Sequence, residues 1–305
     1  MTGIEIEDLG QGLKRGQITH AGLSFSILNF GARSERLRWR DRDLLLGYPN
    51  PQDYLTDPFF IGAIIGRMAG RIPNAELNWA GRSARLHTNE GPNTLHGGAE
   101  GLSQQFWDME ARENQLILRY HSPEGEGGFW GALDLILEIT LGEDQLHYRI
   151  SATGDQDMPL SLTQHNYYHG NLQSGDLALD IGSEAKRFVL DEALLATGAL
   201  SQAKPDLSDM RSGIDDIFLP RAGQAIRVEN RAHPNPYAIS FTSNQPVVVI
   251  YDGGSLSAPF SKNAGFCIEP QAYPNALNIP AFPDPILKAG TTQNYELTLK
   301  FSELT

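Results

Sequence analysis

The amino-acid sequence predicts an all-β fold, either a sandwich or a barrel, for three reasons. Short apolar stretches alternate apolar and polar side chains, as strands with one buried face do. Turn-forming residues separate these stretches throughout the chain, which contains 31 Gly and 18 Pro. Segments with a long helical period are almost absent. Because the 305 residues show no internal repeat and no low-complexity linker, we expect one large β domain over residues 1–305.

Five stretches carry the strand signal most clearly, in the order 22–30, 133–141, 145–153, 245–253 and 293–301. The first, third and fifth alternate apolar and polar side chains, whereas the other two are rich in β-branched residues. The segment DEALLATGAL (191–200) has a helix-like composition, but it is short and contains Gly198.

Four loop-like stretches concentrate polar residues and glycine: GRMAGRIPN (66–74), NEGPNTLHGG (89–98), LTQHNYYHGN (162–171) and EPQAYPNALN (269–278). A fifth, RSGIDDIF (211–218), carries a weaker signal. Since binding groups tend to lie on loops held by a rigid scaffold, we expect the functional residues in these stretches.

The net charge is −13, from 24 Lys+Arg against 37 Asp+Glu. A surface this acidic repels phosphate backbones and anionic lipids, so we expect neither nucleic acid nor a membrane as a partner. A phosphorylated substrate would need a local basic pocket. No stretch approaches the roughly 18 apolar residues of a membrane-spanning helix, and the N-terminus shows no secretory signal. The expected location is therefore cytoplasmic.

A single cysteine, Cys267, excludes an internal disulfide and every metal or iron–sulfur site that needs several cysteines. On a strand it would share a face with Glu269, two residues further on. A free cysteine is usually a small buried hydrophobic residue, so we expect Cys267 to fill core space rather than flank a site.

Two histidines lie in these loops. His96 is followed by two glycines, which allow positive φ and leave room for a ligand beside the ring. The alternative is a surface histidine in a turn without a functional role. His165 is close to Tyr167 and Tyr168, whose rings could stack on a sugar or belong to the core. His169 is a competing candidate four residues later.

Glu269 follows the uncharged run GFCI and precedes Pro270. A carboxylate at the end of a buried strand is partly desolvated, which raises its pKa and makes it a better base. The alternative is an edge-strand glutamate paired with an arginine.

Arg67 and Arg71 lie in GRMAGRI, and an arginine fork suits paired hydroxyls or a carboxylate. We expect one of the two to be structural. Asp215 and Asp216 are adjacent, so on a strand only one of them can reach a given site. The chain has no GxGxxG after a strand, no GxxxxGK[ST], no HExxH, no GxSxG and no CxxC, which removes most support for nucleotide cofactors and serine-hydrolase chemistry.

A series of motifs resembles, in order, the aldose 1-epimerase (galactose mutarotase) family: ILNFGAR, LLLGYPNPQDY, FFIGAIIGRMAGRI, NEGPNTLHGG, FWDME, LTQHNYY, LLATGALS, GIDDIF and GFCIEPQAYPNALN, which leads into the C-terminal strand. The resemblance covers nearly the whole chain, and GPNTLHGG and EPQAYPNALN are its specific parts. It implies a large antiparallel β-sandwich, the galactose mutarotase-like supersandwich, with a sugar cleft on one face.

The resemblance also implies roles for individual residues. Glu269 matches the family's catalytic base, His165 its general acid and His96 its second active-site histidine. Arg71 and Asp215 match the residues that hold sugar hydroxyls.

Four departures from the family's pattern bear on the preferred sugar and leave the reaction class intact. One is the short region between His165 and Asp215. Gly70 stands where the family usually has Asn, and Val249 stands where many members have Gln. After His165 the chain has NYYHGNL instead of the family's Tyr-Phe-Asn-Leu run.

The implied reaction interconverts the α and β anomers of a free aldohexose such as glucose or galactose. A base takes the proton of the C1 hydroxyl while an acid protonates the ring oxygen, each within about 2.6–3.2 Å of its partner. We expect an ionised Glu269 and a charged His165, which attract each other. The reaction needs no cofactor and no metal, and its partner is a monosaccharide; monomer and homodimer both remain open.

Three alternatives remain at this stage. Two histidines and a carboxylate on a β-sandwich could form a non-haem metal site of the cupin type, although the chain lacks an H-x-H motif. A hexose-6-phosphate 1-epimerase would need a basic cluster, for which Arg67, Arg71 and Arg82 are candidates. The third is a non-catalytic sugar-binding protein on the same scaffold.

Overall fold

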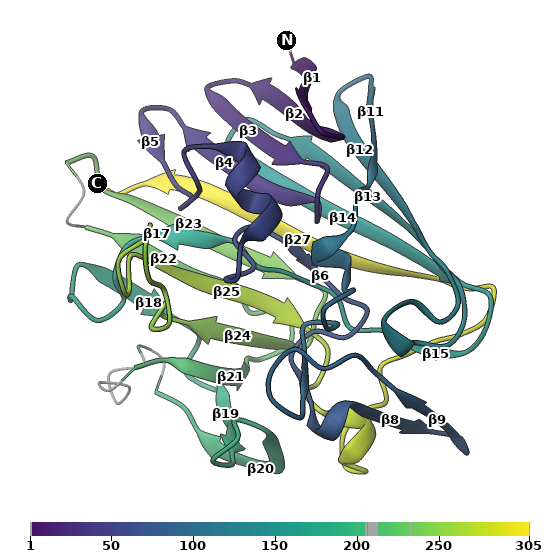
Figure 1. Ribbon diagram of the computed structural model, residues 1–305. Coiled ribbons are helices and arrows are strands. Elements are labelled where there is room, and N and C mark those ends of the chain that lie inside the picture. Colours follow the sequence, from purple (N-terminus) through teal and green to yellow (C-terminus); the bar gives the residue numbers. More distant parts are fainter. Residues whose placement is uncertain (1, 205, 207–212, 232–233, 305) are drawn as a thin grey trace.

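The computed structural model describes residues 2–204, 206, 213–231 and 234–304. Within these ranges the regular elements are β-strands and short 3-10 helices, so the all-β prediction is confirmed. The strands form three large antiparallel sheets, arranged as two packed layers (Figure 1). No helix among the described residues has the length and apolar character needed to span a membrane.

The largest sheet has the strand order β11-β12-β13-β14-β27-β23-β22-β18. Its strands are β11 (Asp108–Arg112), β12 (Gln115–Ser122), β13 (Leu133–Leu141), β14 (Gln145–Gly154), β18 (Leu177–Asp180), β22 (Ile226–Asn230), β23 (Tyr237–Ser243) and β27 (Thr292–Glu303). Every second residue of β13 is buried, so the period-two pattern of the sequence becomes one core face and one outer face. The late strand β27 lies in the middle, between β14 and β23.

The N-terminal sheet covers part of this core face. Its strands follow the chain order: β1 (Gly3–Gly10), β2 (Leu13–His20), β3 (Leu23–Leu28), β4 (Arg33–Trp39) and β5 (Arg42–Asp43). Phe25 of β3 meets Tyr148 of β14 edge to face, with ring centroids 5.7 Å apart. Trp39 of β4 stacks on Phe301 of β27 at 5.8 Å. These contacts place the two sheets face to face.

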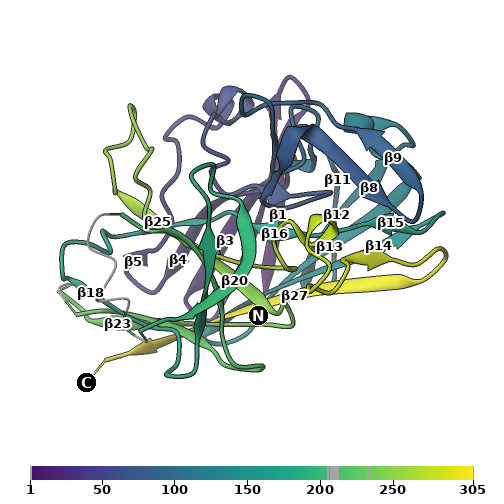
Figure 2. The same ribbon diagram turned by 90° about the horizontal axis from the view of Figure 1, so that it is seen from below.

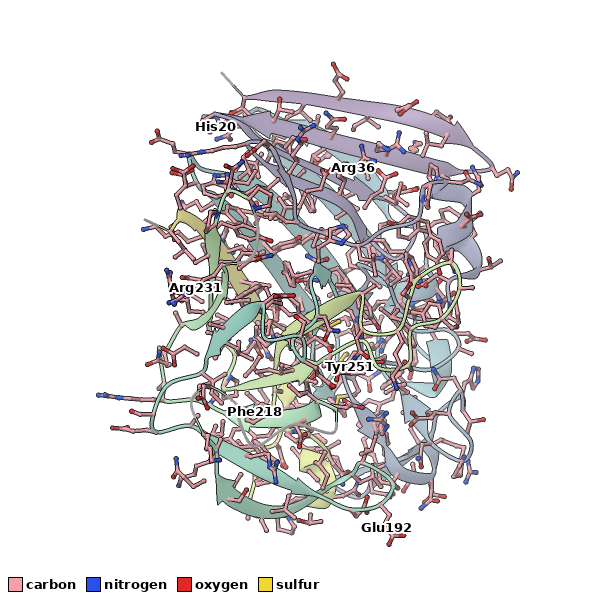
Figure 3. All side chains as sticks on the ribbon, turned by 90° about the vertical axis from the view of Figure 1, so that its left-hand side faces the viewer. His20, Arg36, Glu192, Phe218, Arg231 and Tyr251 are labelled. Atoms are coloured by element: carbon pink, nitrogen blue, oxygen red, sulfur yellow. The ribbon has the colours of Figure 1, made fainter. Side chains whose placement is uncertain are left out.

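A third sheet of order β17-β25-β24-β21-β19-β20 covers the rest of the core face. Its strands are β17 (Tyr167–His169), β19 (Lys186–Leu190), β20 (Ala196–Gln202), β21 (Asp215–Leu219), β24 (Val247–Tyr251) and β25 (Gly265–Gln271). Tyr168 of β17 packs on Phe241 of β23 with centroids 5.0 Å apart. Figure 2 shows this sheet from below, and Figure 3 marks it with Phe218 and Tyr251, with Glu192 at the tip of the β19–β20 hairpin. We call it the cleft sheet.

Short elements connect the layers. The two-stranded pairs are β6 (Ile64–Ile65) with β16 (Thr163–Gln164), β7 (Arg71–Ile72) with β10 (Thr94–Leu95), β8 (Glu76–Trp79) with β9 (Arg82–Arg85), and β15 (Met158–Pro159) with β26 (Ile286–Leu287). The 3-10 helices are η1 (Pro51–Thr56), η2 (Pro73–Ala75), η3 (Leu102–Gln104), η4 (Glu126–Gly128) and η5 (Ala276–Asn278).

All five expected strands exist, as β3, β13, β14, β24 and β27. The segment 191–200 differs from its helix-like composition, because its second half belongs to strand β20. The Asp191 carboxylate accepts hydrogen bonds from the backbone N–H groups of Ala193 and Leu195. Such an Asx turn competes with helix formation and reverses the chain from β19 into β20.

A buried ion pair fixes the loop that leads from η1 to β6. Arg33 and Asp57 have fully buried side chains, and Arg33 Nη1 lies 2.5 Å from Asp57 Oδ2. Arg33 also donates to the carbonyls of Ile61 and Ser103, and the Asp57 carboxylate accepts from the Tyr48 hydroxyl and the Ile61 N–H. Because each charge has several partners, the pair holds residues 57–61 in one conformation.

Removal of one partner should therefore destabilise the fold strongly. We expect Asp57→Ala to lower the free energy of unfolding by roughly 3–5 kcal/mol, since it leaves the Arg33 charge buried without its counterion. Chemical denaturation measures this change. The matched control is Glu76→Ala, which breaks the exposed pair with Arg85 and should cost at most about 1 kcal/mol. Equal losses in the two variants would contradict this account.

Candidate active site

A cleft of about 470 Å³ lies on the face of the cleft sheet that points away from the core. Its floor comes from alternate residues of three neighbouring strands: Glu269 and Gln271 of β25, Val249 and Tyr251 of β24, and Asp215 and Ile217 of β21. Loops supply the walls, among them the segment after Asp57 with Phe59 and Phe60, and the turn that carries His96. Because successive side chains of a strand point to opposite faces, residues of these strands alternate between the core and the cleft.

Strand β25 is buried along its whole length, but its two faces differ. Phe266 and Ile268 point into the main hydrophobic core. Cys267, Glu269 and Gln271 share the opposite face, next to the cleft. Glu269 is only 2 % exposed, and its Oε2 has no hydrogen-bond partner among the described residues.

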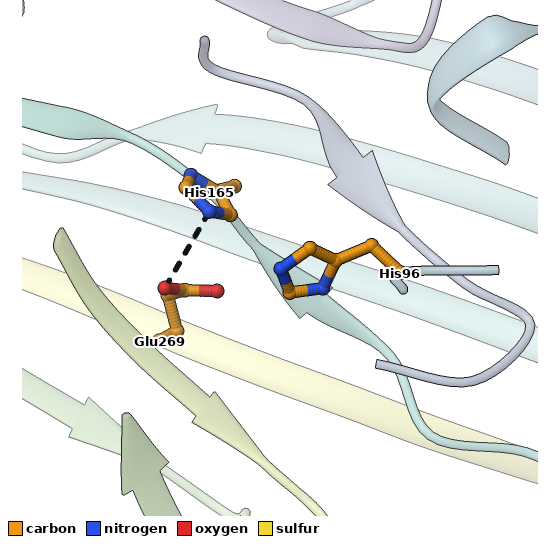
Figure 4. A group of neighbouring side chains, drawn as sticks. All are labelled: His96, His165 and Glu269. Carbon is orange, nitrogen blue, oxygen red and sulfur yellow. Dashed lines mark ion pairs between the residues drawn. The ribbon is translucent and has the colours of Figure 1, made fainter. Parts of the chain in front are cut away.

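His165 faces Glu269 from the connection between β16 and β17. Its backbone N–H donates to the carbonyl of Ala63, and its own carbonyl accepts from the N–H of Gly62, which clamps the chain on both sides. The imidazole is nearly buried, with Nε2 3.6 Å from Glu269 Oε1 (Figure 4). Its other nitrogen, Nδ1, lies 3.6 Å from Cys267 Sγ.

The Cys267 thiol contacts the imidazole nitrogen of His165 that points away from Glu269. Burial raises the pKa of the Cys267 thiol well above its ordinary value, so the thiol stays protonated and can donate to Nδ1. Cys267 is therefore a core residue, as expected, and also a neighbour of the site.

His96 lies at the end of the turn after β10, with a φ of 54°. Its N–H donates to the carbonyl of Gly70, and the Gly70 N–H donates back to His96 Nδ1 at 3.3 Å. The His96 ring is perpendicular to the His165 ring at a centroid distance of 5.3 Å. A side chain at Gly97 would collide with the backbone carbonyl of Gly66, so the glycine after His96 lets two loops approach closely.

Burial disfavours charge on all three central residues. It lowers the pKa of His165 to about 4 and that of His96 well below its ordinary value. It raises the pKa of Glu269 well above its ordinary value, with a smaller contribution from the nearby Asp215. The expected ion pair of a charged His165 and an ionised Glu269 is thus opposed by desolvation. A neutral imidazole beside a protonated carboxyl holds the same number of protons as that ion pair.

Arg71 lies on the far wall of the cleft between two carboxylates. Its Nε donates to Glu90 Oε2 at 2.9 Å, and its Nη2 lies 3.8 Å from Asp215 Oδ2. Desolvation raises the pKa of Asp215, although the charge of Arg71 opposes this shift. All five residues singled out from the sequence, Glu269, His165, His96, Arg71 and Asp215, therefore line one cleft.

Other candidates lie elsewhere. Arg67 is buried and donates to Ser122 Oγ and to the carbonyls of Ser122 and Gly131, so it is the structural arginine of its pair. Arg82 is exposed and donates to Gln156. His169 is exposed at the end of β17, and Asp216 does not line the cleft. Of the stretch 211–218, Arg211 and Ser212 lie outside the described residues.

Among the cleft residues that sequence reasoning missed, three lie next to the candidate residues. Gln271 could have been found by alternation, because it shares the face of Glu269 two positions later. Glu90 lies in an expected loop, but its pairing with Arg71 depends on the packing of that loop. Phe60, whose ring centroid lies 5.0 Å from that of His96, gave no sequence signal.

His96, His165 and Glu269 also form a group suited in type to a metal ion. Their ligand atoms all lie within 4.8 Å of one another. Two imidazoles and a carboxylate are ligands of iron, zinc and related ions. The effect of a chelator on activity therefore tests whether a metal binds here.

Replacing the buried Glu269 carboxyl by an amide should stabilise the protein, and the gain should grow with pH. The pKa of Glu269 is higher in the folded than in the unfolded chain, so the stability linked to this group is present at low pH and is lost as the pH rises through the folded pKa. We expect Glu269→Gln to raise Tm more at pH 8 than at pH 5, as measured by calorimetry. The control is Glu76→Gln, at an exposed position of strand β8. A gain that does not grow with pH would contradict the assignment.

Comparisons with known proteins identify the family of this chain. The profile of the aldose 1-epimerase family matches residues 14–300. Galactose mutarotase from Bos taurus is 29% identical to this chain, and the match covers 96% of each protein. Aldose 1-epimerase from Escherichia coli K12 is 25% identical, and the match covers 87% of this chain and 88% of the relative. A crystal structure of an aldose epimerase homologue from C. elegans superposes with a TM-score of 0.87 at 22% identity, covering both chains fully. Galactose 1-epimerase from Lactobacillus acidophilus gives 0.85 at 21%, covering 100% and 99%. The chain belongs to the aldose 1-epimerase family.

Proposed function

We propose that this protein interconverts the α and β anomers of a free aldohexose such as glucose or galactose, without a cofactor. One observation carries the proposal: His165 Nε2 and Glu269 Oε1 face each other at 3.6 Å in a cleft that excludes most water from both. An acid and a base at this separation can act on two neighbouring oxygens of one sugar.

The proposed reaction opens and closes the pyranose ring. Ionised Glu269 takes the proton from the C1 hydroxyl, the C1–O5 bond breaks and O5 receives a proton from His165. The aldehyde turns about C1–C2, and O5 then attacks the other face of C1. In this closing step His165 takes back its proton, and Glu269 returns the first one to the new hydroxyl. After one cycle Glu269 and His165 each hold the same protons as before, and no electron is gained or lost.

The remaining residues hold the sugar. His96 donates from Nε2, because its Nδ1 accepts from Gly70, and it can restrain the ring oxygen or a neighbouring hydroxyl. Arg71 and Asp215 bind hydroxyls on the far wall, where their mutual contact keeps both groups oriented before the sugar arrives. Floor and walls come from segments far apart in the chain, which supports residues 1–305 acting as one domain.

The charge of the cleft favours a free sugar over a sugar phosphate. The arginine that lines it, Arg71, faces Glu90 and Asp215, with Glu269 on the floor. Arg67 and Arg82, which a phosphate site would need, have other partners. A phosphate dianion would meet more negative than positive charge.

The relatives named galactose mutarotase and aldose 1-epimerase support the same chemistry. A purely sugar-binding protein would have no need for an acid–base set such as Glu269, His165 and His96 in one cleft.

Polarimetry tests the proposal directly. We expect the protein to speed the relaxation of freshly dissolved α-D-glucose or α-D-galactose to the usual end-point, with EDTA present, and to be less active on glucose 6-phosphate. Glu269→Gln should lose at least about 100-fold in rate. The matched control is His169→Gln, outside the cleft. Loss of activity on chelation would favour the metal alternative, and tight sugar binding without acceleration would favour a binding protein.

The pH profile offers a separate test. The proposed active form holds one mobile proton on the pair of His165 and Glu269. We expect kcat/KM to fall below about pH 4, where His165 also takes up a proton, and to fall again above the raised pKa of Glu269, where the pair has lost its proton. Buffer-catalysed mutarotation is subtracted at each pH. A profile flat through the acid range down to pH 3 would refute this proton count.

A further inference from the structure

Gln271 is a deeply buried polar side chain on the cleft floor. The proposed reaction gives it no role. It is 1 % exposed, and neither Nε2 nor Oε1 has a hydrogen-bond partner among the described residues. Buried amides nearly always have partners, because each unsatisfied group costs about 1–3 kcal/mol. A side chain that serves only the fold would not leave both ends of its amide unused.

The position of Gln271 points the amide at a ligand. It is the second residue after Glu269 on β25, so both side chains leave the strand on the cleft side, with their Cα atoms roughly 6.6 Å apart. A sugar whose C1 hydroxyl is at Glu269 would therefore present a different hydroxyl to Gln271. An amide offers a donor and an acceptor side by side, which matches one hydroxyl as both acceptor and donor or two adjacent hydroxyls.

Gly70 leaves the space that this contact needs. A Cβ built on Gly70 would lie 3.6 Å from Gln271 Nε2, and Gly70 has a φ of 80°. No side chain at this position can cover the amide or compete for it. The same glycine is hydrogen-bonded to His96, and Arg71 follows it, so Gln271 lies beside the residues proposed to hold the sugar.

We propose that Gln271 is a substrate-binding residue that hydrogen-bonds a ring hydroxyl beyond the anomeric carbon and selects for sugars that carry it. The inference rests on the proposed aldose 1-epimerase activity. It assigns a contact that determines which aldoses are accepted. On the neighbouring strand the residue paired with Glu269 is Val249, whose apolar side chain cannot hydrogen-bond a sugar hydroxyl.

The test combines one substitution with a panel of sugars. Polarimetry gives kcat and KM for glucose and its 2-, 3- and 4-deoxy analogues, with the wild-type protein and with Gln271→Met, which keeps the length and removes the amide. We expect one deoxy sugar to show a three- to tenfold lower kcat/KM than glucose in the wild type. In Gln271→Met, glucose should lose the same factor, mainly through KM, and the preference over that deoxy sugar should vanish.

Stability provides the second readout. Met removes an unpaired buried amide, so Tm of the sugar-free variant should be equal to or higher than that of the wild type. A side chain that holds the structure would instead lower Tm. Gln52→Met is the matched control, since its Oε1 also lacks a partner in the described structure but lies outside the cleft. It should leave the sugar preferences unchanged.

The outcomes separate the two claims. If the wild type does not accelerate mutarotation, the proposed function fails, whatever the variant does. If the wild type is active and Gln271→Met keeps the wild-type preference among the sugars, the inference about Gln271 is wrong. A drop in Tm with equal losses on all sugars would also overturn it, because it would mark a structural residue. Gln271→Leu repeats the experiment if the Met variant does not fold.

Discussion

The site depends on the two faces of strand β25. The strand is the second of the cleft sheet, paired with β17 along residues 265–267 and with β24 along residues 267–271, so both neighbours hold its backbone in place. Since neighbouring residues point in opposite directions, Phe266 and Ile268 anchor it in the core and thereby fix Cys267, Glu269 and Gln271 against the cleft. A shift of register by one residue would exchange the two sets and place a carboxylate in the core.

Burial gives the cleft its chemistry and costs stability. Desolvation raises the pKa of Glu269 and lowers that of His165, so burial favours the uncharged form of each group. The rigid support of His165 by residues 62–63 and of the preceding loop by the Arg33–Asp57 pair maintains this arrangement. A local energetic cost of this kind, offset by well-packed layers elsewhere, is common in active sites.

Much of this could be predicted from sequence. Alternation and β-branched content identified five strands, three of them in the largest sheet, and the resemblance pointed to five residues that line one cleft. The charge state of the pair could not be predicted, because it depends on how completely two layers exclude water. The role of Arg67 depends on carbonyls more than fifty residues away, and the contact between Cys267 and His165 joins positions 102 residues apart. Local patterns contain no information on such distances.

The position of β27 has a consequence for how the molecule assembles. The strand bridges β14 and β23, and without it the largest sheet would be two separate halves with open edges. Residues 292–303 must therefore be in place before the core face is continuous and before the cleft sheet has a full surface to pack on. Because β27 is the last of these strands in chain order, the edges of β14 and β23 stay unpaired until it is added, and an unpaired edge can associate with a neighbouring chain.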